Sequence, residues 1–515
     1  MSSNKTGIEV FITKNENKAN RICTIIEIVL ICLFSVLALI LAATNGAIWL
    51  DEAYSLDFIR GSWQRLIYIL SIDVHPPVYY FILKLFIDIF GESIFIARLV
   101  SVLPTVLTMI FVTLFLNKEF SRKAAVIFLL CFTASQSIIH HSLDIRMYSW
   151  ALLFVTMTAI AAWYIITIGK TRWYAAFLIF AEGAAYTHVY AGLTVAIGYL
   201  LLLGYILKYD RKNTIKTLII IPLAVLLYLP WLSVMIGAFV RSSGDFWIGP
   251  LTIRTVVSYV VFVFGAGNPI FALVFFSLFF AVFCFFLVRA KTKKEWFALC
   301  CLSCIIILAG IGISISIAIR PLLVARYLFP ACGLVWLFFA IICGSIKNTR
   351  VFAFICCVLL ALGFSTFSSS LYKGKKDNAG FVQYHRYIKE HAASQDVFIF
   401  LSQPDKHFDS HLSGITAYLF PGHVHIRQKP LTTALGQFVF DRDTITFADL
   451  DNTDKFHERR GWILADNTNV NIPLTLDDFL ENNAEFRGDF GWRGYKFRLY
   501  YTENPMAFSS ATTWE

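Results

Sequence analysis

Long apolar blocks of about 20 residues, the length of helix that crosses the hydrocarbon core of a membrane, divide this sequence. The chain of 515 residues is 57% hydrophobic and only 15% charged, whereas soluble proteins carry roughly 25% charged residues. A water-soluble core does not bury this much apolar surface, so we predict an all-α polytopic membrane domain with about eleven transmembrane helices. The expected spans are 22–43, 94–116, 124–139, 147–168, 173–186, 189–207, 217–236, 269–288, 296–319, 324–345 and 351–370.

The distribution of lysine and arginine predicts the orientation of these spans. A cytoplasmic N-terminal segment, residues 1–21, places every strongly basic short loop on the cytoplasmic side, as the positive-inside rule requires. The first apolar block is longer than the 7–15 residues of a signal-peptide core, so we interpret it as an uncleaved helix. The net charge of +10 thus reflects topology, and no basic stripe predicts nucleic-acid binding. The basic loops are 117–123, 169–172, 208–216, 289–294 and 346–350.

Two other apolar stretches and the C-terminal third complete the expected architecture. Val78–Phe90 and residues 256–265 are short, and we expect them to be helices that lie along the outer interface. From Leu371 onward, polar runs and strand-like segments predict a soluble α/β or α+β domain outside the cytoplasm. The expected domains are a cytoplasmic segment (1–21), a transmembrane catalytic domain (22–370, with its first outer loop at 44–93) and the soluble domain (371–515).

The predicted outer loops hold acidic and basic side chains beside the membrane, where such residues are costly and often functional. Asp51 and Glu52 follow the first span. A carboxylate there can act as a general base or cap the helix that follows. Arg146 and Arg326 precede later helices, where arginine can bind phosphate with two parallel hydrogen bonds or anchor the helix at lipid headgroups. Both interpretations stay open for each residue.

Several histidines in the same loops leave a divalent metal open. His75, His140, His141 and His188 could bind one together with Asp73 or Asp144. No helix has the ligand spacing of an HExxH motif, and histidine and tyrosine beside a membrane are commonly interface residues. The sequence therefore assigns no metal ligand.

A family resemblance emerges from the order of these motifs. Trp49 to Ser55 reads WLDEAYS, Asp73 to Tyr80 reads DVHPPVYY, and RMY and RY follow at Arg146 and Arg326. This series resembles the bacterial glycosyltransferase family 39 group. These are GT-C-fold enzymes related to protein O-mannosyltransferases and to the aminoarabinose transferases of lipid A. The resemblance extends from Leu33 to Ser345.

The resemblance implies an inverting glycosyltransferase whose sugar donor is linked through phosphate to a polyprenyl lipid. In that family's arrangement Asp51 would orient or deprotonate the acceptor hydroxyl, Glu52 would support it, and Arg146 and Arg326 would hold the carrier phosphate. His75, Asp73, Asp144, Tyr148, His188 and Tyr327 would belong to the same substrate-binding region. Val74 stands where aminoarabinose transferases have glutamate, and His75 where they have lysine, so neither their zinc site nor their sugar is carried over.

Two other function classes are weighed against this one. A transporter or lipid flippase would tend to show internal repeats and charges within its spans, but we find no repeat, and Glu27 and Glu182 are the main acids in apolar blocks. A non-catalytic membrane subunit would not gather Asp51, Arg146 and Arg326 in one cavity. The acceptor, whether glycan, lipid or protein, is not specified. The outer regions lack N-x-S/T sequons, which favours a bacterial plasma membrane over the endoplasmic reticulum.

Overall fold

The computed structural model describes residues 3–241, 248–264, 269–401, 408–427, 444–446, 459–466, 474–493 and 495–505. The chain forms two compact units, each built from several chain segments. The helical unit comprises Met1–Ile40, His75–Ile82 and Arg98–Ser370, and the sheet unit comprises Leu41–Val74, Leu83–Ala97 and Leu371–Glu515. Most of the first outer loop therefore belongs to the same compact unit as the C-terminal region. The expected domains, which are continuous along the chain, do not describe this grouping.

The long helices confirm a multi-pass membrane protein. Nine helices in the described ranges are long and apolar enough to cross a membrane, and the pair α6 and α7, bent by 68°, makes ten if it is one span. The eleventh expected span, 173–186, corresponds to α9, which has only 15 residues. The helices are α1 Ser3–Thr44, α5 Ile94–Glu119, α6 Arg122–Ala134, α7 Gln136–Leu143, α8 Tyr148–Ile168, α9 Thr171–Ala185, α10 Val189–Tyr209, α11 Thr214–Arg241, α13 Pro269–Arg289, α14 Lys293–Ala318, η2 Ala325–Ala331 with α15 Cys332–Gly344, and α16 Thr349–His391.

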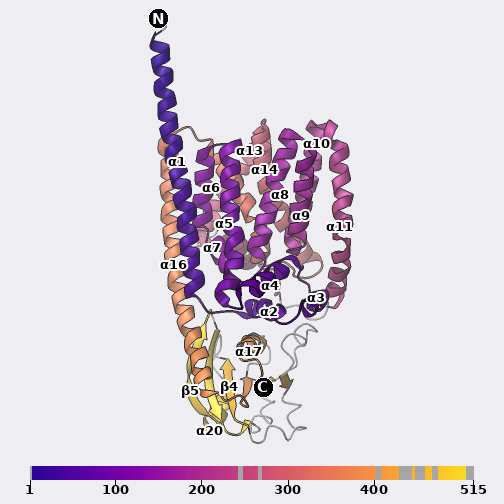
Figure 1. Ribbon diagram of the computed structural model, residues 1–515, viewed down its shortest axis with the longest axis vertical. Helices are drawn as coiled ribbons and strands as arrows, with labels where there is room; N and C mark the ends of the chain where they lie inside the picture. Colours follow the sequence, from indigo (N-terminus) through magenta and orange to yellow (C-terminus); the bar gives the residue numbers. More distant parts are fainter. Residues whose placement is uncertain are drawn as a thin grey trace. The chain divides into compact units, whose positions relative to one another are not determined.

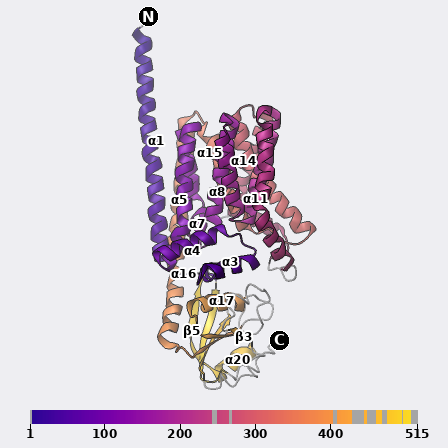
Figure 2. The ribbon, with the colours of Figure 1, turned by 45° about the vertical axis from the view of Figure 1, so that its right-hand side comes forward.

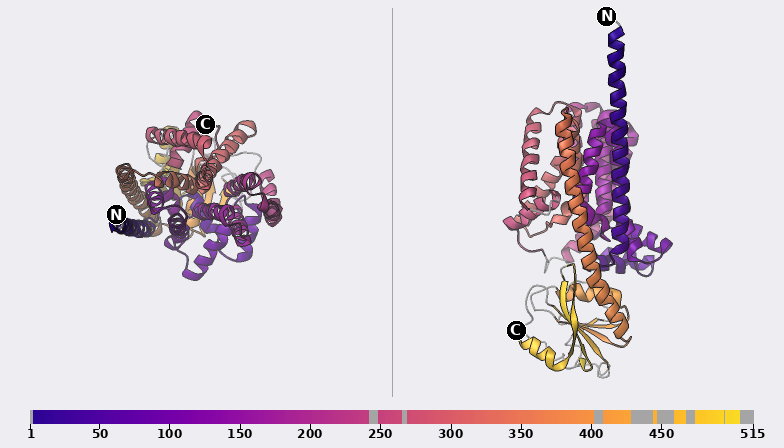
Figure 3. Two further views of the ribbon diagram at one scale, coloured as in Figure 1. Left: turned by 90° about the horizontal axis from the view of Figure 1, so that it is seen from above. Right: turned by 90° about the vertical axis from the view of Figure 1, so that its left-hand side faces the viewer.

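The helical unit is a bundle with an apolar outer surface. Figures 1 and 2 show α5, α8 and α11 running in nearly the same direction, and the left view of Figure 3 looks down the bundle. Large apolar side chains such as Leu200, Ile215 and Leu226 are exposed on its surface, as lipid contact requires. Inside, α6 and α15 approach so closely that a Cβ on Gly344 would lie 2.6 Å from the Cβ of Ala124. Small residues at such crossings are typical of membrane helices.

Shorter helices occupy the loops. The two stretches expected as interfacial helices are helical: α4 (Val78–Phe90) has 13 residues and α12 (Ile253–Phe264) has 12. Their position along the membrane interface stays a prediction. In the sheet unit, α3 begins after Ser62, whose hydroxyl accepts the backbone N–H of Arg65 at 3.2 Å. The remaining short helices are α2 Leu50–Phe58, α3 Trp63–Ile72 and η1 Arg211–Asn213.

A six-stranded mixed sheet forms the C-terminal part of the sheet unit, in the order β3-β2-β1-β4-β6-β5. Parallel pairing joins β3, β2, β1 and β4, and β6 is antiparallel to both β4 and β5. All five residues of β1 are buried, as expected for a central strand covered on both faces. The result confirms a C-terminal domain of the predicted α/β or α+β class, and the strand-like sequences at 397–401 and 461–464 lie in two of its strands. The elements are β1 Val397–Leu401, α17 Phe408–Leu419, β2 Val424–Arg427, β3 Thr444–Thr446, β4 Gly461–Asp466, α20 Leu474–Asn483, β5 Glu485–Trp492 and β6 Tyr495–Thr502.

Candidate active site

Asp51 and Glu52 lie in the first turn of α2, where the helix dipole stabilises negative side chains. Glu52 is fully buried, and its Oε2 accepts the backbone N–H of Trp49 at 3.2 Å. This contact is the helix-capping role that was the alternative interpretation of the pair. Asp51 is partly exposed. The structure therefore distinguishes a capping acid, Glu52, from a candidate general base, Asp51.

Glu52 has a partner that sequence reasoning missed. The guanidinium Nη1 of Arg493 lies 2.7 Å from Glu52 Oε2, within the sheet unit. Arg493 stands between β5 and β6, more than 400 residues away along the chain (441 positions). Its sequence signal is weak, because a lone arginine followed by glycine between two strand-like segments reads as an ordinary turn.

Arg146 lies in the helical unit, just before α8, and its buried side chain is held by two residues of the DVHPPVYY motif. Arg146 Nη2 lies 2.9 Å from His75 Nε2, and Nη1 donates to the Tyr80 hydroxyl at 3.3 Å. Because a guanidinium only donates, Nε2 is the unprotonated nitrogen of the His75 ring in this contact. Arg98, fully buried in α5, donates to the Leu143 carbonyl at 2.6 Å and so fixes the segment before Arg146.

His188, which directly precedes α10, is a buried histidine whose pKa is affected by several charged residues of the helical unit. The pKa of His188 is lowered to about 3, chiefly by burial, with His75, Arg146 and Arg326 acting in the same direction. The two arginines predicted to bind phosphate thus both act on one buried ring. The rings of Tyr148 and Tyr327 each lie 5.6 Å from His188, centroid to centroid. Six predicted site residues therefore converge in this unit.

The lowered pKa of His188 predicts acid sensitivity. An unfolded histidine titrates near pH 6.5, so between this value and the folded pKa of about 3 the unfolded state binds the additional proton. The contribution of His188 to the free energy of unfolding is therefore fully present above about pH 6.5. It is lost as pH falls toward 3, by up to about 1.4 kcal/mol per pH unit. We expect His188→Gln to flatten the fall of the thermal midpoint between pH 6.5 and 4. His391→Gln, at an exposed histidine, is the control; equal acid sensitivity of wild type and His188→Gln would contradict the prediction.

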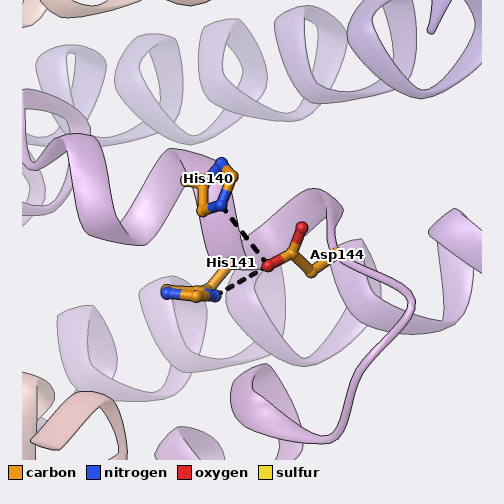
Figure 4. A group of neighbouring side chains, drawn as sticks. All are labelled: His140, His141 and Asp144. Atoms are coloured by element: carbon orange, nitrogen blue, oxygen red, sulfur yellow. Dashed lines mark hydrogen bonds and ion pairs between the residues drawn. The ribbon is translucent and has the colours of Figure 1, made fainter. Parts of the chain in front are cut away.

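Asp144 forms a small cluster with two histidines of α7, shown in Figure 4. Asp144 Oδ2 lies 2.9 Å from His141 Nδ1 and 3.6 Å from His140 Nε2. These separations bracket the roughly 3.3 Å expected between ligands bound 2.0–2.1 Å from a tetrahedral zinc ion. The shorter one is also an ordinary hydrogen bond. The trio is the candidate metal cluster in the described part of the chain.

We expect the sugar transfer that the family resemblance implies to survive metal removal, because a hydrogen bond already joins His141 to Asp144. The measurement is sugar transfer before and after treatment with EDTA, together with the metal content of the purified protein. His140→Ala removes the most exposed of the three ligands and is the matched variant. Loss of activity on chelation, restored by zinc in wild type but not in His140→Ala, would make the trio a metal centre.

Asp73 is assigned to a different compact unit from the arginine cluster. It belongs to the sheet unit and is buried at the end of α3, where its backbone N–H donates to the Ile69 carbonyl at 3.0 Å. The site residues thus fall into two groups. Asp51, Glu52 and Asp73 lie in the sheet unit, and His75, Asp144, Arg146, Tyr148, His188, Arg326 and Tyr327 lie in the helical unit. That both groups act on one substrate stays a prediction.

Comparisons with known proteins bear on the fold and the family of the chain. Residues 74–236, which include Arg146 and His188, match the family model described as dolichyl-phosphate-mannose-protein mannosyltransferase. The crystal structure of ArnT from Cupriavidus metallidurans bound to undecaprenyl phosphate superposes with a TM-score of 0.62 at 11% identity, over 92% of this chain and 97% of that one. The chain has the GT-C fold. The apo form of the same protein gives a TM-score of 0.60 at 11% identity, over the same shares of the two chains.

The GT-C fold and the match at 74–236 confirm the resemblance predicted from the sequence motifs. They indicate a glycosyltransferase in general terms. A search of curated proteins gave no match.

Proposed function

We propose that this protein is an inverting glycosyltransferase that moves a sugar from a polyprenyl-phosphate carrier to an acceptor outside the cytoplasm. The observation that carries the proposal is the group of Arg146, Arg326 and His75 around the neutral ring of His188. Such a cluster suits a phosphate group because guanidinium pairs bind its oxygens in fixed geometry. The ArnT structure was solved with undecaprenyl phosphate, a carrier of this chemical class.

The proposed reaction needs one base and one cationic site. The acceptor hydroxyl gives its proton to the Asp51 carboxylate while its oxygen attacks the anomeric carbon of the sugar. The bond between this carbon and the phosphate oxygen breaks, and its electron pair stays on the phosphate. Arg146 and Arg326 stabilise the charge that grows there. Attack from the face opposite the phosphate inverts the anomeric centre.

The roles of the surrounding residues follow from their contacts. His75 and Tyr80 hold the Arg146 guanidinium, so that it meets the phosphate without reorganising. The rings of Tyr148 and Tyr327 pack beside His188 and so help to fix the position of its ring. Glu52 supports Asp51 by capping the helix that carries it. The acceptor, a glycan, lipid or protein, would bring only its hydroxyl to Asp51.

The proposed topology places the N-terminus in the cytoplasm and the active site on the outer face of a bacterial plasma membrane. Residues 1–21, 22–370 and 371–515 are the corresponding cytoplasmic, catalytic and soluble segments along the chain. This orientation is supported by the basic short loops, because it places all of them on the cytoplasmic side. Transfer on this face would use a lipid-linked donor because nucleotide sugars are cytoplasmic.

The direct test is turnover of a lipid-linked donor. Protein in lipid nanodiscs is incubated with a panel of polyprenyl-phosphate sugars and candidate acceptors, and released polyprenyl phosphate is quantified by mass spectrometry. The proposal expects release that depends on the acceptor. A flippase would instead move an intact donor across a vesicle membrane without releasing carrier, and that result would overturn the proposal.

A further inference from the structure

The β5–β6 turn and the strand residues on either side of it contact the segment at the start of α2 through three side chains, all within the sheet unit. The indole Nε1 of Trp492 donates to the Ile48 carbonyl at 2.9 Å. Arg493 Nη1 pairs with Glu52 Oε2 at 2.7 Å. Tyr495 hydrogen-bonds with the backbone of Leu50. Three residues close to Asp51 in the sequence, Ile48, Leu50 and Glu52, are thus each bound by a residue in or next to this turn.

Arg493 is held in an unusual backbone conformation. Its φ of 48° makes it the non-glycine residue with a positive φ in the described part of the chain, a conformation that costs a side-chain-bearing residue free energy. Its backbone N–H donates to Asp377 Oδ1 of α16 at 2.9 Å. A glycine would fit this backbone without cost, so the presence of arginine indicates that its side chain is needed there.

The charge of Glu52 explains this need. The Glu52 side chain is fully buried and that of Arg493 is 13% exposed. A buried carboxylate requires a partner, because removing one member of such a pair leaves an uncompensated charge. Burial, together with Asp51 and Glu52, raises the pKa of Tyr495 to about 12, so its hydroxyl stays protonated beside the two acids.

A second set of contacts joins the same segments farther along. Arg60, just after α2, lies 4.0 Å from the centre of the Tyr418 ring of α17 and donates to the Tyr418 carbonyl at 3.0 Å. Near α2's other end, Gly46 donates its backbone N–H to Asn378 Oδ1 of α16 at 2.7 Å. The C-terminal region therefore holds both ends of the segment that carries the acidic pair.

We propose that the β5–β6 turn positions the acidic pair for sugar transfer, and that Arg493 is a positioning residue that acts through Glu52. The catalytic part of this inference rests on the function proposed above for Asp51. Its structural part does not, because the contacts themselves fix α2. The C-terminal region would then be a working part of the transferase in addition to any part it has in binding acceptor.

The test compares Arg493→Gln with wild type in full-length protein in nanodiscs. Hydrogen exchange of the peptide covering residues 48–58 reports the position of α2 independently of activity, and we expect faster exchange there in the variant. We also expect kcat to fall by roughly tenfold or more, with an unchanged KM for donor, because misplacement of a catalytic group by about 1 Å costs up to 10²-fold. Arg487→Gln, which breaks the partly exposed Arg487–Glu485 pair of the same hairpin, is the matched control.

Two further variants separate charge compensation from general damage. Arg493→Lys should restore part of the protection and turnover, since it keeps the positive charge. The double variant Glu52→Gln/Arg493→Gln should protect residues 48–58 better than Arg493→Gln alone, since no unpaired charge remains. Unchanged exchange in Arg493→Gln, or equal effects from Arg487→Gln, would overturn the proposal. Absence of transfer by wild type with altered exchange in Arg493→Gln would instead refute the proposed function and leave the structural role of Arg493 supported.

Discussion

Replacement of Asp51 by asparagine is expected to lower kcat for sugar transfer by a factor of about 10²–10⁴, the rate enhancement that a general base contributes. Asparagine keeps the size and polarity of the side chain but cannot take the acceptor proton. Asp51 is the partly exposed member of the pair, whereas Glu52 is buried and bonded to Trp49. The fold should survive the change, since an asparagine near a helix start is well tolerated. The measurement is polyprenyl phosphate release under saturating donor and acceptor.

Two companion variants show whether this loss reflects chemistry. Glu52→Gln should reduce thermal stability as well as turnover, because it leaves Arg493 without its partner carboxylate. Asp88→Asn changes another acid of the sheet unit, paired with Lys84 at 3.0 Å, and should leave turnover near that of wild type. Normal turnover by Asp51→Asn would remove Asp51 from the role of base.

The membrane architecture was predictable because its signals are local. Apolar blocks such as 189–207 persist along one helix, here α10, and the match of the long helices to the expected spans follows from that. The span at 173–186 shows the limit of this reasoning. Hydropathy places it in the membrane, but Gly169 at φ 68° ends α8 just before α9 begins at Thr171, and the turn before His188 ends α9 after 15 residues. Backbone breaks of this kind depend on the conformation of one or two residues.

The candidate site was predictable in part, for a different reason. Arg146, Arg326 and His188 drew attention because charged or polar residues at helix entrances are rare beside a membrane, and the structure brings all three into electrostatic contact. Tyr80 and Arg493 were not singled out as partners. Their importance lies in contacts with Arg146 and Glu52, across 66 and 441 positions of the chain. No local pattern in a single sequence encodes a pairing of that separation.

Removal of the charge of Arg146 or Arg326 is expected to lower kcat by about 10²–10³, comparable to the loss of one preorganised donor to a developing anion. For Arg146→Gln the reason is its preorganisation. His75 and Tyr80 hold the guanidinium, so the charge is in place before the carbon–oxygen bond breaks. Arg146→Lys should recover only part of the rate, because an ammonium group does not reproduce the planar donor pair. Arg172→Gln, at an exposed arginine in a predicted cytoplasmic loop, is the control and should transfer sugar normally.

The effects of replacing the two arginines on kcat should also be non-additive. If both stabilise the same phosphate, the double variant Arg146→Gln/Arg326→Gln should lose less than the product of the two single losses, since groups that act together are not additive. Independence of the two effects would indicate separate ligands. An activity-independent readout accompanies the kinetics: because both charges lower the pKa of His188, each single variant should raise it, which histidine-selective NMR can follow. A variant that loses activity while the pKa of His188 stays unchanged would show that this arginine does not belong to the cationic cluster, and the phosphate site would have to be placed elsewhere in the protein.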